Sequence, residues 1–386
     1  MSDASLNGGA LLNGPGQAKA AQAPVIVQVA KAFSVSPIRQ MRESWSMKGG
    51  AQKLGSNEYY SLRLFHPEMP VAEKRAFAGQ KGINALNARL NPPKAVPTRA
   101  FVGNKLLYTQ LLSQLGLATA ETQALVSTHR HAGNMRVLRD ARALIAFLQH
   151  DARFPIFGKP HHGSLSEGSV RITGCKDGQV YIADGTTRSV IDFADEVMAR
   201  YPGGFILQTA LDPHPQMAEV AGPAVGCVRV VTVNDGTGPE VAYTCWKLPA
   251  PRAMSDNFWQ NGSLLAALDT DTGTVQRVTM GTGMAMADVT KHPVSDRDIV
   301  GLRLPYWDAT LDLARETHAV FPEFGICGFD VAVTPDGPKI LECNDNPSHN
   351  LYQIAARRGV LSPELSALWD RVAERQTKQL ARLNGK

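Results

Sequence analysis

The sequence predicts an α+β protein with a small, mostly helical N-terminal unit. Three observations support this fold class. Short helical patterns occupy residues 25–95, glycine-containing turns separate strand-like apolar runs between residues 154 and 247, and two further apolar runs flank a Pro-Asp-Gly-Pro turn at 335–338. At 386 residues the chain can bury a large core and should contain two or three compact units.

Composition excludes several classes of function. Apolar residues make up 44% of the chain and charged residues 19%, as in ordinary globular proteins. The net charge of +5 is small, and no Lys/Arg block forms a nucleic-acid-binding arm. The chain contains no run of 18 apolar residues, so the sequence predicts no membrane span. A phosphate-bearing ligand is therefore the more economical explanation of the mild basicity.

The cysteines and the N-terminus favour a cytoplasmic location. The five cysteines form no CxxC pair, and four lie in apolar, strand-like contexts. Buried, reduced thiols of this kind are typical of cytoplasmic proteins. The N-terminus also lacks the positive segment and apolar core of a secretory signal.

The first elements along the chain are helical. Residues 1–24 are small and polar and predict a disordered tail, and the helical unit follows over residues 25–95. A helix is expected from Asn104, its N-cap, to Gly116, its stop signal, and a second over residues 136–149. The apolar stripe of the first comprises Leu106, Leu107, Leu111, Leu112 and Leu115.

Strands dominate the rest of the chain. Six are predicted, at residues 154–159, 168–173, 179–183, 204–209, 225–233 and 240–247. A helix over residues 308–320 precedes the C-terminal hairpin. A final amphipathic helix over residues 361–386 begins with Ser362 as N-cap and Pro363 at its first position.

The C-terminal hairpin carries the most informative residues. If its turn is centred near Asp336, then Asp330 and Glu342 are equidistant from the centre and face each other. Asn344 shares the face of Glu342, because side chains on a strand repeat every second residue. Hard oxygen donors that converge in this way suit Mg²⁺. A surface hairpin with solvated acids is the simpler alternative, but the apolar neighbours make an uncompensated charge there costly.

Three cations fit a phosphate-bearing ligand. Lys159 ends a strand-like run before a small-residue loop whose backbone N–H groups could hold an anion. Lys105 lies near a helix N-terminus, where a positive charge is unfavourable, and Arg229 lies inside an apolar strand. A solvated helix lysine and a structural carboxylate for Arg229 are the plainer alternatives.

The sequence gives less support to dinucleotide binding, zinc binding or nucleophilic catalysis by serine. The chain has no Walker A motif, no GxGxxG after a strand and no histidines at metal-ligand spacing, so neither a Rossmann domain nor a zinc site is expected. Residues 163–167 lack the closing glycine of a nucleophile elbow. The polar loop over residues 255–263, with Asp256 and Asn257, is a candidate substrate contact. His349 is also a candidate substrate contact, or it could cap the next helix.

These residues, taken in order, resemble the ATP-grasp superfamily, and most closely its sugar-transfer-associated group. The residues that carry the resemblance are Lys105, Lys159, the Gly/Ser loop, Gln208, Arg229, Asp330, Glu342 and Asn344. The phrases at 57–60, 211–215, 228–232, 256–258 and 328–330 are similar to patterns of that group. The resemblance covers roughly residues 35–355, and the spaced Asp…Glu-x-Asn signature is its most specific part.

The resemblance implies an ATP-grasp domain over residues 96–360, whose two α+β subdomains, 96–208 and 209–360, grip ATP. One or two Mg²⁺ ions would be held by Asp330, Glu342 and Asn344. The predicted nucleotide contacts are Lys105 and Lys159 to phosphates, a covering loop with Gly163, Ser164, Gly168 and Ser169, and Gln208 and Leu211 near adenine. Two departures stand out: Gln208 replaces an acidic residue of many members, and Ser255 replaces the arginine of the R-x-N turn in ATP-grasp glutamate ligases.

The expected reaction joins a small-molecule carboxylate to an amine or a thiol. ATP would phosphorylate the carboxylate, and Lys159 and Arg229 would act as the catalytic residues that hold the transferring group. A small-molecule kinase and a non-catalytic ATP-binding module are alternatives, and the intact metal-binding set disfavours the second. A link to polysaccharide or small-metabolite biosynthesis follows from the resemblance alone, and the residues predict no oligomeric state.

Overall fold

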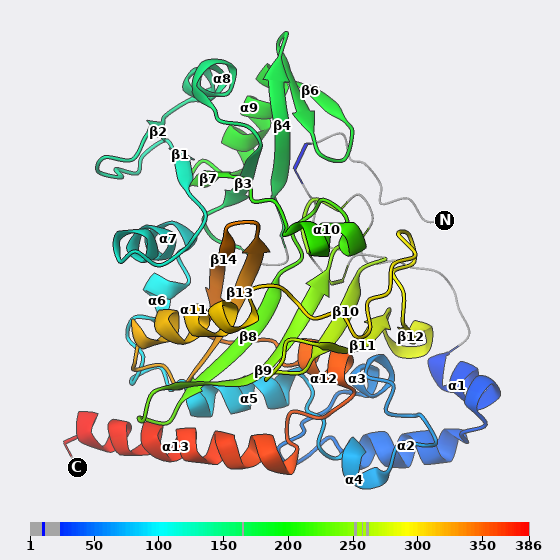
Figure 1. Ribbon diagram of the computed structural model, residues 1–386. Coiled ribbons are helices and arrows are strands. Elements are labelled where there is room, and N and C mark those ends of the chain that lie inside the picture. Colours follow the sequence, from blue (N-terminus) through cyan, green and yellow to red (C-terminus); the bar gives the residue numbers. More distant parts are fainter. Residues whose placement is uncertain are drawn as a thin grey trace.

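The computed structural model describes residues 10–11, 24–163, 166–250, 253–256, 258–259 and 262–385. Two seven-stranded sheets dominate the fold, one built from residues 122–209 and the other from residues 228–344 (Figure 1). Helices pack on both sheets, which confirms the predicted α+β class. Most of the predicted N-terminal tail lies outside the described residues.

The first sheet has the strand order β2-β1-β7-β3-β4-β5-β6. Its strands are β1 (Thr122–Val126), β2 (Val137–Leu138), β3 (Ile156–Pro160), β4 (Val170–Lys176), β5 (Gln179–Ile182), β6 (Thr187–Ser189) and β7 (Phe205–Thr209). Helices α8 (Ala141–Ala146) and α9 (Val190–Arg200) pack together against it. Phe193 and Phe205 are buried in the core between these layers.

The second sheet is antiparallel throughout, with the order β12-β11-β10-β9-β8-β13-β14. Its strands are β8 (Val228–Asn234), β9 (Pro239–Leu248), β10 (Leu264–Leu268), β11 (Val275–Met280), β12 (Ala287–Val289), β13 (Ile326–Thr334) and β14 (Gly337–Asn344). Every residue of β8 and β13 is buried. Burial on both faces explains why these strands are largely apolar instead of alternating regularly with polar residues.

Helical layers cover both faces of the second sheet. On one face, α11 (Trp307–Ala319) packs against β8, β9, β13 and β14, and α7 (Lys105–Gln114) and α10 (Pro215–Ala221) share its core. On the other lie the N-terminal helices, α12 (Asn350–Ala356) and α13 (Pro363–Leu383). Val230 belongs to the core with α11 and its neighbour Val231 to the core with α13, because successive side chains on a strand point to opposite faces.

The N-terminal unit is helical, as predicted, but has no core of its own. Its helices are α1 (Val25–Phe33), α2 (Pro37–Ser46), α3 (Ser56–Ser61), α4 (Val71–Lys74) and α5 (Gln80–Leu90), and the short α6 (Arg99–Val102) follows. Tyr59 and Phe65 share one apolar cluster with Cys245 of β9 and Leu265 of β10. The unit therefore forms part of the cover of the second sheet.

Several helix boundaries follow the predicted capping residues. Asn104 Oδ1 accepts a hydrogen bond from Leu107 N and begins α7, and Ser362 is the N-cap of α13. The helix predicted over 136–149 is instead β2 followed by α8, because Asp140 caps the helix and α8 starts at Ala141, five residues later than expected. No described helix is long and apolar enough to cross a bilayer.

Some predicted and observed elements differ. Of the predicted apolar stripe, Leu106 and Leu112 of α7 are buried as expected, whereas Leu107 and Leu115, the C-cap of the helix, are exposed. Strands β1, β10 and β11 and helix α9 were not predicted. The sequence of β10, Leu-Leu-Ala-Ala-Leu, has high helix propensity, but pairing on both edges with β9 and β11 and complete burial override it.

Candidate active site

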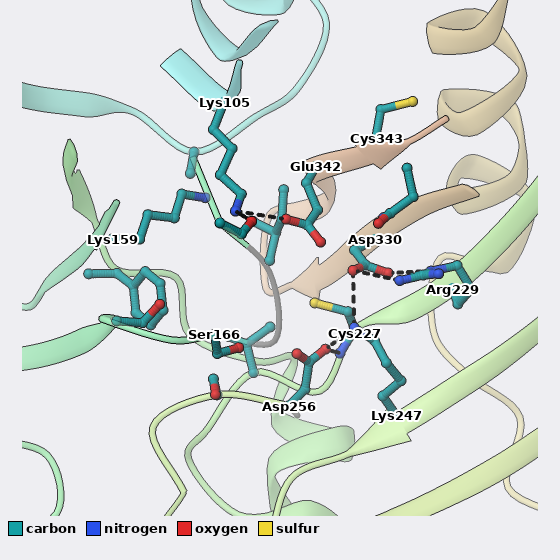
Figure 2. A pocket seen from close by; sticks show the side chains of 18 of the residues that line it. Lys105, Lys159, Ser166, Cys227, Arg229, Lys247, Asp256, Asp330, Glu342 and Cys343 are labelled. Carbon is teal, nitrogen blue, oxygen red and sulfur yellow. Dashed lines mark hydrogen bonds and ion pairs between the residues drawn. The ribbon is translucent and has the colours of Figure 1, made fainter. Parts of the chain in front are cut away.

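A cavity of about 480 Å³ lies between the two sheets. Lys159 of β3 and Gln208 of β7 line it from the first sheet, and Arg229 of β8, Lys247 of β9 and Asp330 of β13 line it from the second. Figure 2 shows Lys159 on one side of this space and Asp330 with Arg229 on the other. The strands of both sheets thus bring charged side chains together in one cleft.

The hairpin of β13 and β14 sets Asp330 opposite Glu342, as predicted. Its turn is tighter than the sequence suggested: Thr334 pairs with Gly337, and an unbroken ladder from there would set Asp330 opposite Leu341. A β-bulge beside Asp330 shifts the register by one residue. Without this shift Glu342 would turn to the other face of its strand, because side chains alternate along it.

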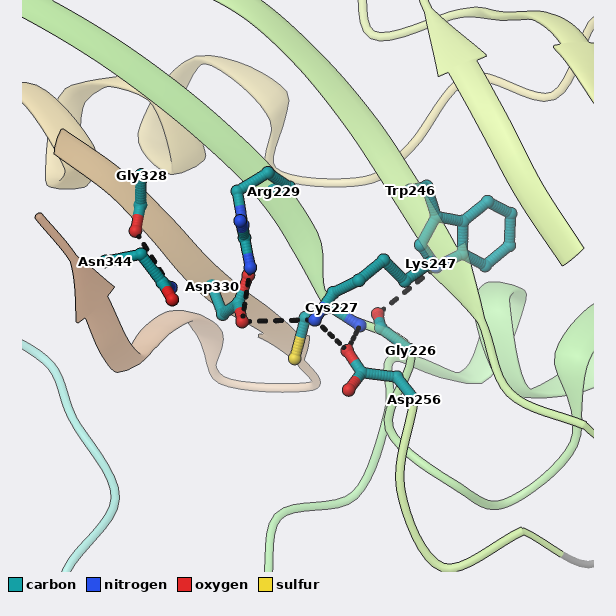
Figure 3. A network of polar contacts seen from close by, with 9 residues as sticks. All are labelled: Gly226, Cys227, Arg229, Trp246, Lys247, Asp256, Gly328, Asp330 and Asn344. Carbon is teal, nitrogen blue, oxygen red and sulfur yellow. Dashed lines mark hydrogen bonds and ion pairs between the residues drawn. The ribbon is translucent and has the colours of Figure 1, made fainter. Parts of the chain in front are cut away.

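Asp330 is buried between two cations (Figure 3). Its Oδ1 accepts a hydrogen bond from Arg229 Nε at 2.6 Å, and its Oδ2 accepts from Arg229 Nη2 and from Lys247 Nζ, both at 3.1 Å. Burial alone would raise the pKa of Asp330, but the two cations outweigh burial and hold that pKa well below its usual value. The carboxylate therefore stays ionised.

The predicted metal-binding side chains keep free acceptor positions. A carboxylate has about four lone pairs, and the three hydrogen bonds to Asp330 leave one of them on Oδ1. Glu342 Oε2 lies 3.6 Å from Lys105 Nζ. Asn344 Nδ2 donates to Gly328 O at 3.2 Å, so its Oδ1 is available. Two carboxylates and an amide oxygen fit Mg²⁺, which completes its shell with water and phosphate oxygens.

No three His, Cys, Asp or Glu side chains gather as a metal-binding group in the described part of the chain. An ion at the hairpin would therefore depend on the Asn344 oxygen and on ligand oxygens as well as on the two carboxylates.

Lys105 and Lys159 differ in their surroundings. Lys105 is the first residue of α7, and its Nζ donates to Gly163 O at 2.7 Å. Lys159 is only 9% exposed, and its ammonium group donates to none of the described residues. Burial, and then the nearby Lys105, lower the pKa of Lys159 to about 8. An ammonium group that ends a largely buried side chain, has no partner among the described residues and lies next to a second ammonium calls for an anionic ligand.

The loop predicted to cover the phosphates is described in part. Gly163 and Ser169 line the cavity, whereas Ser164 lies outside the described residues. Gly168 is not among the lining residues. Its φ is +75°, and a Cβ there would clash with Tyr201, so backbone conformation and packing account for this glycine without a ligand.

Gln208 and Leu211 line the cavity, and their contact with adenine stays a prediction. Gln208 is buried and its Nε2 donates to Thr122 Oγ1 at 3.3 Å. Arg171 lines the same region and was not foreseen. It donates to Leu211 O at 2.9 Å and to Asp212 Oδ1 at 2.7 Å, which fixes the chain after β7.

Asp256 lines the cavity and is held in place from two sides. Its Oδ2 accepts a hydrogen bond from Cys227 N at 3.0 Å and lies 2.9 Å from Lys247 Nζ. Lys247 also contacts Asp330. It therefore links Asp330, at the centre of the cleft, with the loop that contains Asp256. Asn257 lies outside the described residues.

His349 lies outside the cavity lining, which corrects its expected contact with substrate. It is fully buried, with Nε2 2.8 Å from Asn87 Oδ1 and Nδ1 2.6 Å from the Tyr243 hydroxyl. An amide oxygen can only accept, so Nε2 carries the proton and Nδ1 accepts from Tyr243. Asn87 in turn donates to Asn346 Oδ1 at 2.7 Å. His349 therefore ties α5 to the chain that follows the hairpin.

Acid should destabilise the protein through its buried histidines. Burial lowers the pKa of His349 to about 3 and that of His318 to about 4. Since both values lie below the unfolded one, about 6.5, the unfolded chain binds the protons more tightly and stability falls as pH drops below 6.5. Each histidine should cost about 2 kcal/mol by pH 5.

Urea unfolding at neutral pH and at about pH 5 tests this expectation. His349→Gln should be less stable than wild type at neutral pH but should lose about 2 kcal/mol less on acidification. His129→Gln makes the same substitution at an exposed histidine and serves as the matched control. An equal loss in wild type and His349→Gln would contradict the expectation.

Lys247 is the main site residue that the sequence analysis missed. It lies in the run Tyr-Thr-Cys-Trp-Lys-Leu of β9, an apolar strand interrupted by one cation. This is the signal that singled out Arg229, and applied to β9 it would have identified Lys247. Its two carboxylate partners, Asp256 and Asp330, come from distant parts of the sequence and only the fold brings them together.

Two helix-covered sheets enclose a charged cleft. One sheet contributes a lysine at a strand end, and the other contributes an Asp…Glu-x-Asn hairpin. These features together define the class of the molecule as an ATP-grasp fold. The chain belongs to the sugar-transfer associated ATP-grasp family, whose sequence model matches residues 83–368. The matched region includes both sheets and every described residue of the cleft discussed above.

Solved structures with a similar fold include three ligases. The D-alanine–D-alanine ligase from Coxiella burnetii is 12% identical with a TM-score of 0.43, over 74% of this chain and 60% of that chain. The ATP-grasp ligase PsnB, complexed with a minimal precursor, is 15% identical with a TM-score of 0.37, over 73% and 63%. The L-amino acid ligase from Bacillus licheniformis is 12% identical with a TM-score of 0.39, over 70% and 48%.

The chain spans less than two thirds of the length of each of these three proteins. No curated protein matches it.

Proposed function

We propose that this chain is a Mg²⁺-dependent ligase that uses ATP to join a small-molecule carboxylate to an amine through an acyl phosphate. The observation that carries the proposal is Lys159, a largely buried side chain whose ammonium group faces the cleft and has no hydrogen-bond acceptor among the described residues. The same cleft contains Asp330 and Glu342. Such a cation needs an anion, and membership of an ATP-grasp family supports ATP as that anion.

The charge distribution in the cleft supports a triphosphate. The described lining has five cations, Lys105, Lys159, Arg171, Arg229 and Lys247, and four carboxylates, Asp256, Asp330, Glu342 and Asp345. Arg171, Arg229 and Lys247 each pair closely with a carboxylate. Lys159, with Lys105 beside it, is therefore the cation left for the phosphates, and the ligand would relieve the repulsion between the two ammonium groups.

Asp330, Glu342 and Asn344 would hold the Mg²⁺. When bound, the ion would neutralise charge on the phosphate oxygens and orient them. Lys105 lies beside Glu342, so the same side chain would meet both the phosphates and the carboxylate that holds the metal. The bidentate Arg229 keeps Asp330 oriented toward this position.

Two steps account for the proposed ligation. A carboxylate oxygen of the substrate attacks the γ-phosphorus, the bond to the ADP oxygen breaks, and an acyl phosphate forms. The amine then attacks the acyl carbon, loses a proton and expels phosphate with its electron pair. With Nε and Nη2 engaged by Asp330, Arg229 Nη1 remains to hold the transferring group, opposite Lys159. The side chains position the reactants and balance charge, which is the main requirement of phosphoryl transfer.

Product analysis tests the proposal and separates it from its alternatives. Purified protein with Mg²⁺ and ATP is screened against pooled carboxylates and amines, and ADP and free phosphate are both measured. Ligation predicts equal release of the two that requires both a carboxylate and an amine. A phosphorylated product that accumulates without free phosphate would identify a kinase instead. Tight ATP binding with no turnover in any pool would overturn the proposal.

Nucleotide affinity should decline as the pH rises above about 8. The pKa of Lys159 in the ligand-free protein is about 8, and only the protonated form attracts phosphate. Affinity should therefore be flat below this pH and fall toward tenfold for each pH unit above it. Calorimetric titration with Mg-ATP measures the effect.

Lys159→Arg is the matched control, because a guanidinium keeps its charge at these pH values and should flatten the profile. A wild-type affinity that does not change between about pH 7 and pH 10 would contradict the proposed role of Lys159.

A further inference from the structure

Helix α2 has its apolar side turned to solvent. Ile38, Met41 and Trp45 follow the spacing of one helical face, and they are 74%, 53% and 76% exposed. The buried side of the same helix is polar, with Gln40 fully buried and Ser44 nearly so. A helix on the surface of a globular protein normally buries its apolar side, so this orientation is reversed.

Polar contacts hold α2 in this orientation. Gln40 Nε2 donates to Val35 O at 2.7 Å and to Ile26 O at 3.1 Å. Glu43 accepts from Lys74 Nζ at 2.8 Å, and Lys74 is itself almost fully buried. The polar side of α2 thus fixes the orientation of the helix, and the apolar side stays exposed. Apolar side chains gathered on an otherwise ordered surface indicate a binding partner.

The surroundings of this side are basic. Between residues 24 and 60 the chain has five basic residues, Lys31, Arg39, Arg42, Lys48 and Lys53, and two acidic ones, Glu43 and Glu58. Both acids are engaged: Glu43 with Arg39 and Lys74, and Glu58 with the backbone of Gly55 and Gln80. Arg42 is exposed, and Lys48 Nζ lies 5.6 Å from the centre of the Trp45 ring.

Exposed tryptophan and isoleucine, next to cations that form no ion pair with the described residues, match an anionic lipid surface. The aromatic and aliphatic side chains enter the boundary between headgroups and acyl chains, and the cations meet the lipid phosphates. A protein partner would need a complementary surface of about 1,000 Å² or more, whereas lipid adapts to three protruding side chains. Figure 1 shows α2 at the edge of the molecule with α1 and α4, and none of its residues lines the cavity.

We propose that the face formed by Ile38, Met41 and Trp45, with the flanking Arg42 and Lys48, docks the protein on a membrane surface rich in anionic lipid. The helix would lie in the interface and would not cross the bilayer. The proposal does not depend on the chemistry of the cleft, since α2 and the cavity share no residue.

Vesicle binding by the full-length protein tests the proposal. Wild type should co-sediment with vesicles of equal parts phosphatidylcholine and phosphatidylglycerol, and hardly with phosphatidylcholine alone. Ile38→Ser with Trp45→Ser should lower partitioning on the order of 10- to 100-fold. Arg42→Glu with Lys48→Glu should lower it at least about 10-fold, and salt should weaken wild-type binding.

Two controls separate docking from misfolding. The substituted side chains are exposed, so thermal unfolding should stay close to that of wild type. Ile191→Ser removes a comparably exposed isoleucine from α9, on the first sheet, and should bind vesicles like wild type. Brominated lipid should quench the fluorescence of wild type, and Trp45→Phe should remove that quenching while binding persists.

Three outcomes would overturn the proposal. The first is no wild-type binding to the mixed vesicles, and the second is undiminished binding by both double variants. The third is a wild-type dimer that becomes monomeric in Ile38→Ser/Trp45→Ser without any vesicle binding, which would assign the face to a second copy of the chain.

Discussion

Lys159→Met should make the ligand-free protein more stable and should abolish nucleotide binding. The pKa of Lys159 is about 8 in the folded protein. Against an unfolded value of about 10.4, this corresponds to roughly 3 kcal/mol of destabilisation at neutral pH. Methionine has a similar length and no charge, so the variant should gain about 2–3 kcal/mol. Phosphate would lose its buried cation, and affinity for Mg-ATP should fall on the order of 10²-fold or more.

The pH dependence of stability identifies the cause of this effect. Because the folded pKa lies below the unfolded one, wild type loses stability as the pH falls from about 10.4 to about 8 and loses no more below that range. The methionine variant lacks this loss. The difference between the two should be complete at neutral pH and should vanish above about pH 10.5.

Urea unfolding across this pH range measures the difference. Lys105→Met is the matched control: Lys105 contacts Gly163 O and Glu342 and so has partners to lose, and its removal should not stabilise the protein. Should Lys159→Met prove less stable than wild type at neutral pH, Lys159 would have a structural role in place of the proposed one.

Asp330→Asn should impair both folding and turnover. The amide cannot balance Arg229 and Lys247, which are both buried, and breaking such a pair typically costs about 3–5 kcal/mol. The same change removes a predicted metal-binding carboxylate, and turnover should fall on the order of 10²-fold or more. Chemical unfolding and steady-state kinetics measure the two effects in one variant.

Glu342→Gln separates metal binding from stability. Glu342 is half-buried, and its nearest cation, Lys105, is 3.6 Å away, so its loss should change stability by about 0.5 kcal/mol or less. Turnover should still fall strongly, and raised Mg²⁺ should restore part of it, because a weakened site fills at higher metal concentration. Normal Mg²⁺ dependence in Glu342→Gln would count against the hairpin as the metal site.

The residues of the cleft were largely predictable because each is a charged side chain in an otherwise apolar segment. Asp330 and Glu342 are acids in apolar strands, and Arg229 is a cation in another. An uncompensated charge in such a context is costly, so it indicates a partner or a ligand without any knowledge of the fold. Lys247 gave the same signal and was overlooked.

The role of His349 could not be predicted from its local sequence. Its position after the hairpin suggested a contact with substrate, but the partners that bury it, Asn87 and Tyr243, come from α5 and β9. A histidine has the same local sequence whether its ring faces a cavity or a core, so long-range packing alone decided its role. Gly168 is a similar case in one respect: the nearby Tyr201, which a Cβ would meet, comes from a distant segment, and the predicted place of Gly168 in a phosphate-covering loop stays a prediction.

The sequence by itself determined which side chains carry charge into apolar strands, where capping residues begin α7 and α13, and which family the signature resembles. These are local properties of composition and spacing. The tertiary structure decided the register that aligns Asp330 with Glu342, through a bulge that corrects a tighter turn, and the pairing of Asp330 with both Arg229 and Lys247. It also decided that Lys159 is largely buried with no partner among the described residues, and that α2 turns its apolar side outward. Each depends on contacts between distant segments, and only the packing of the whole chain specifies them.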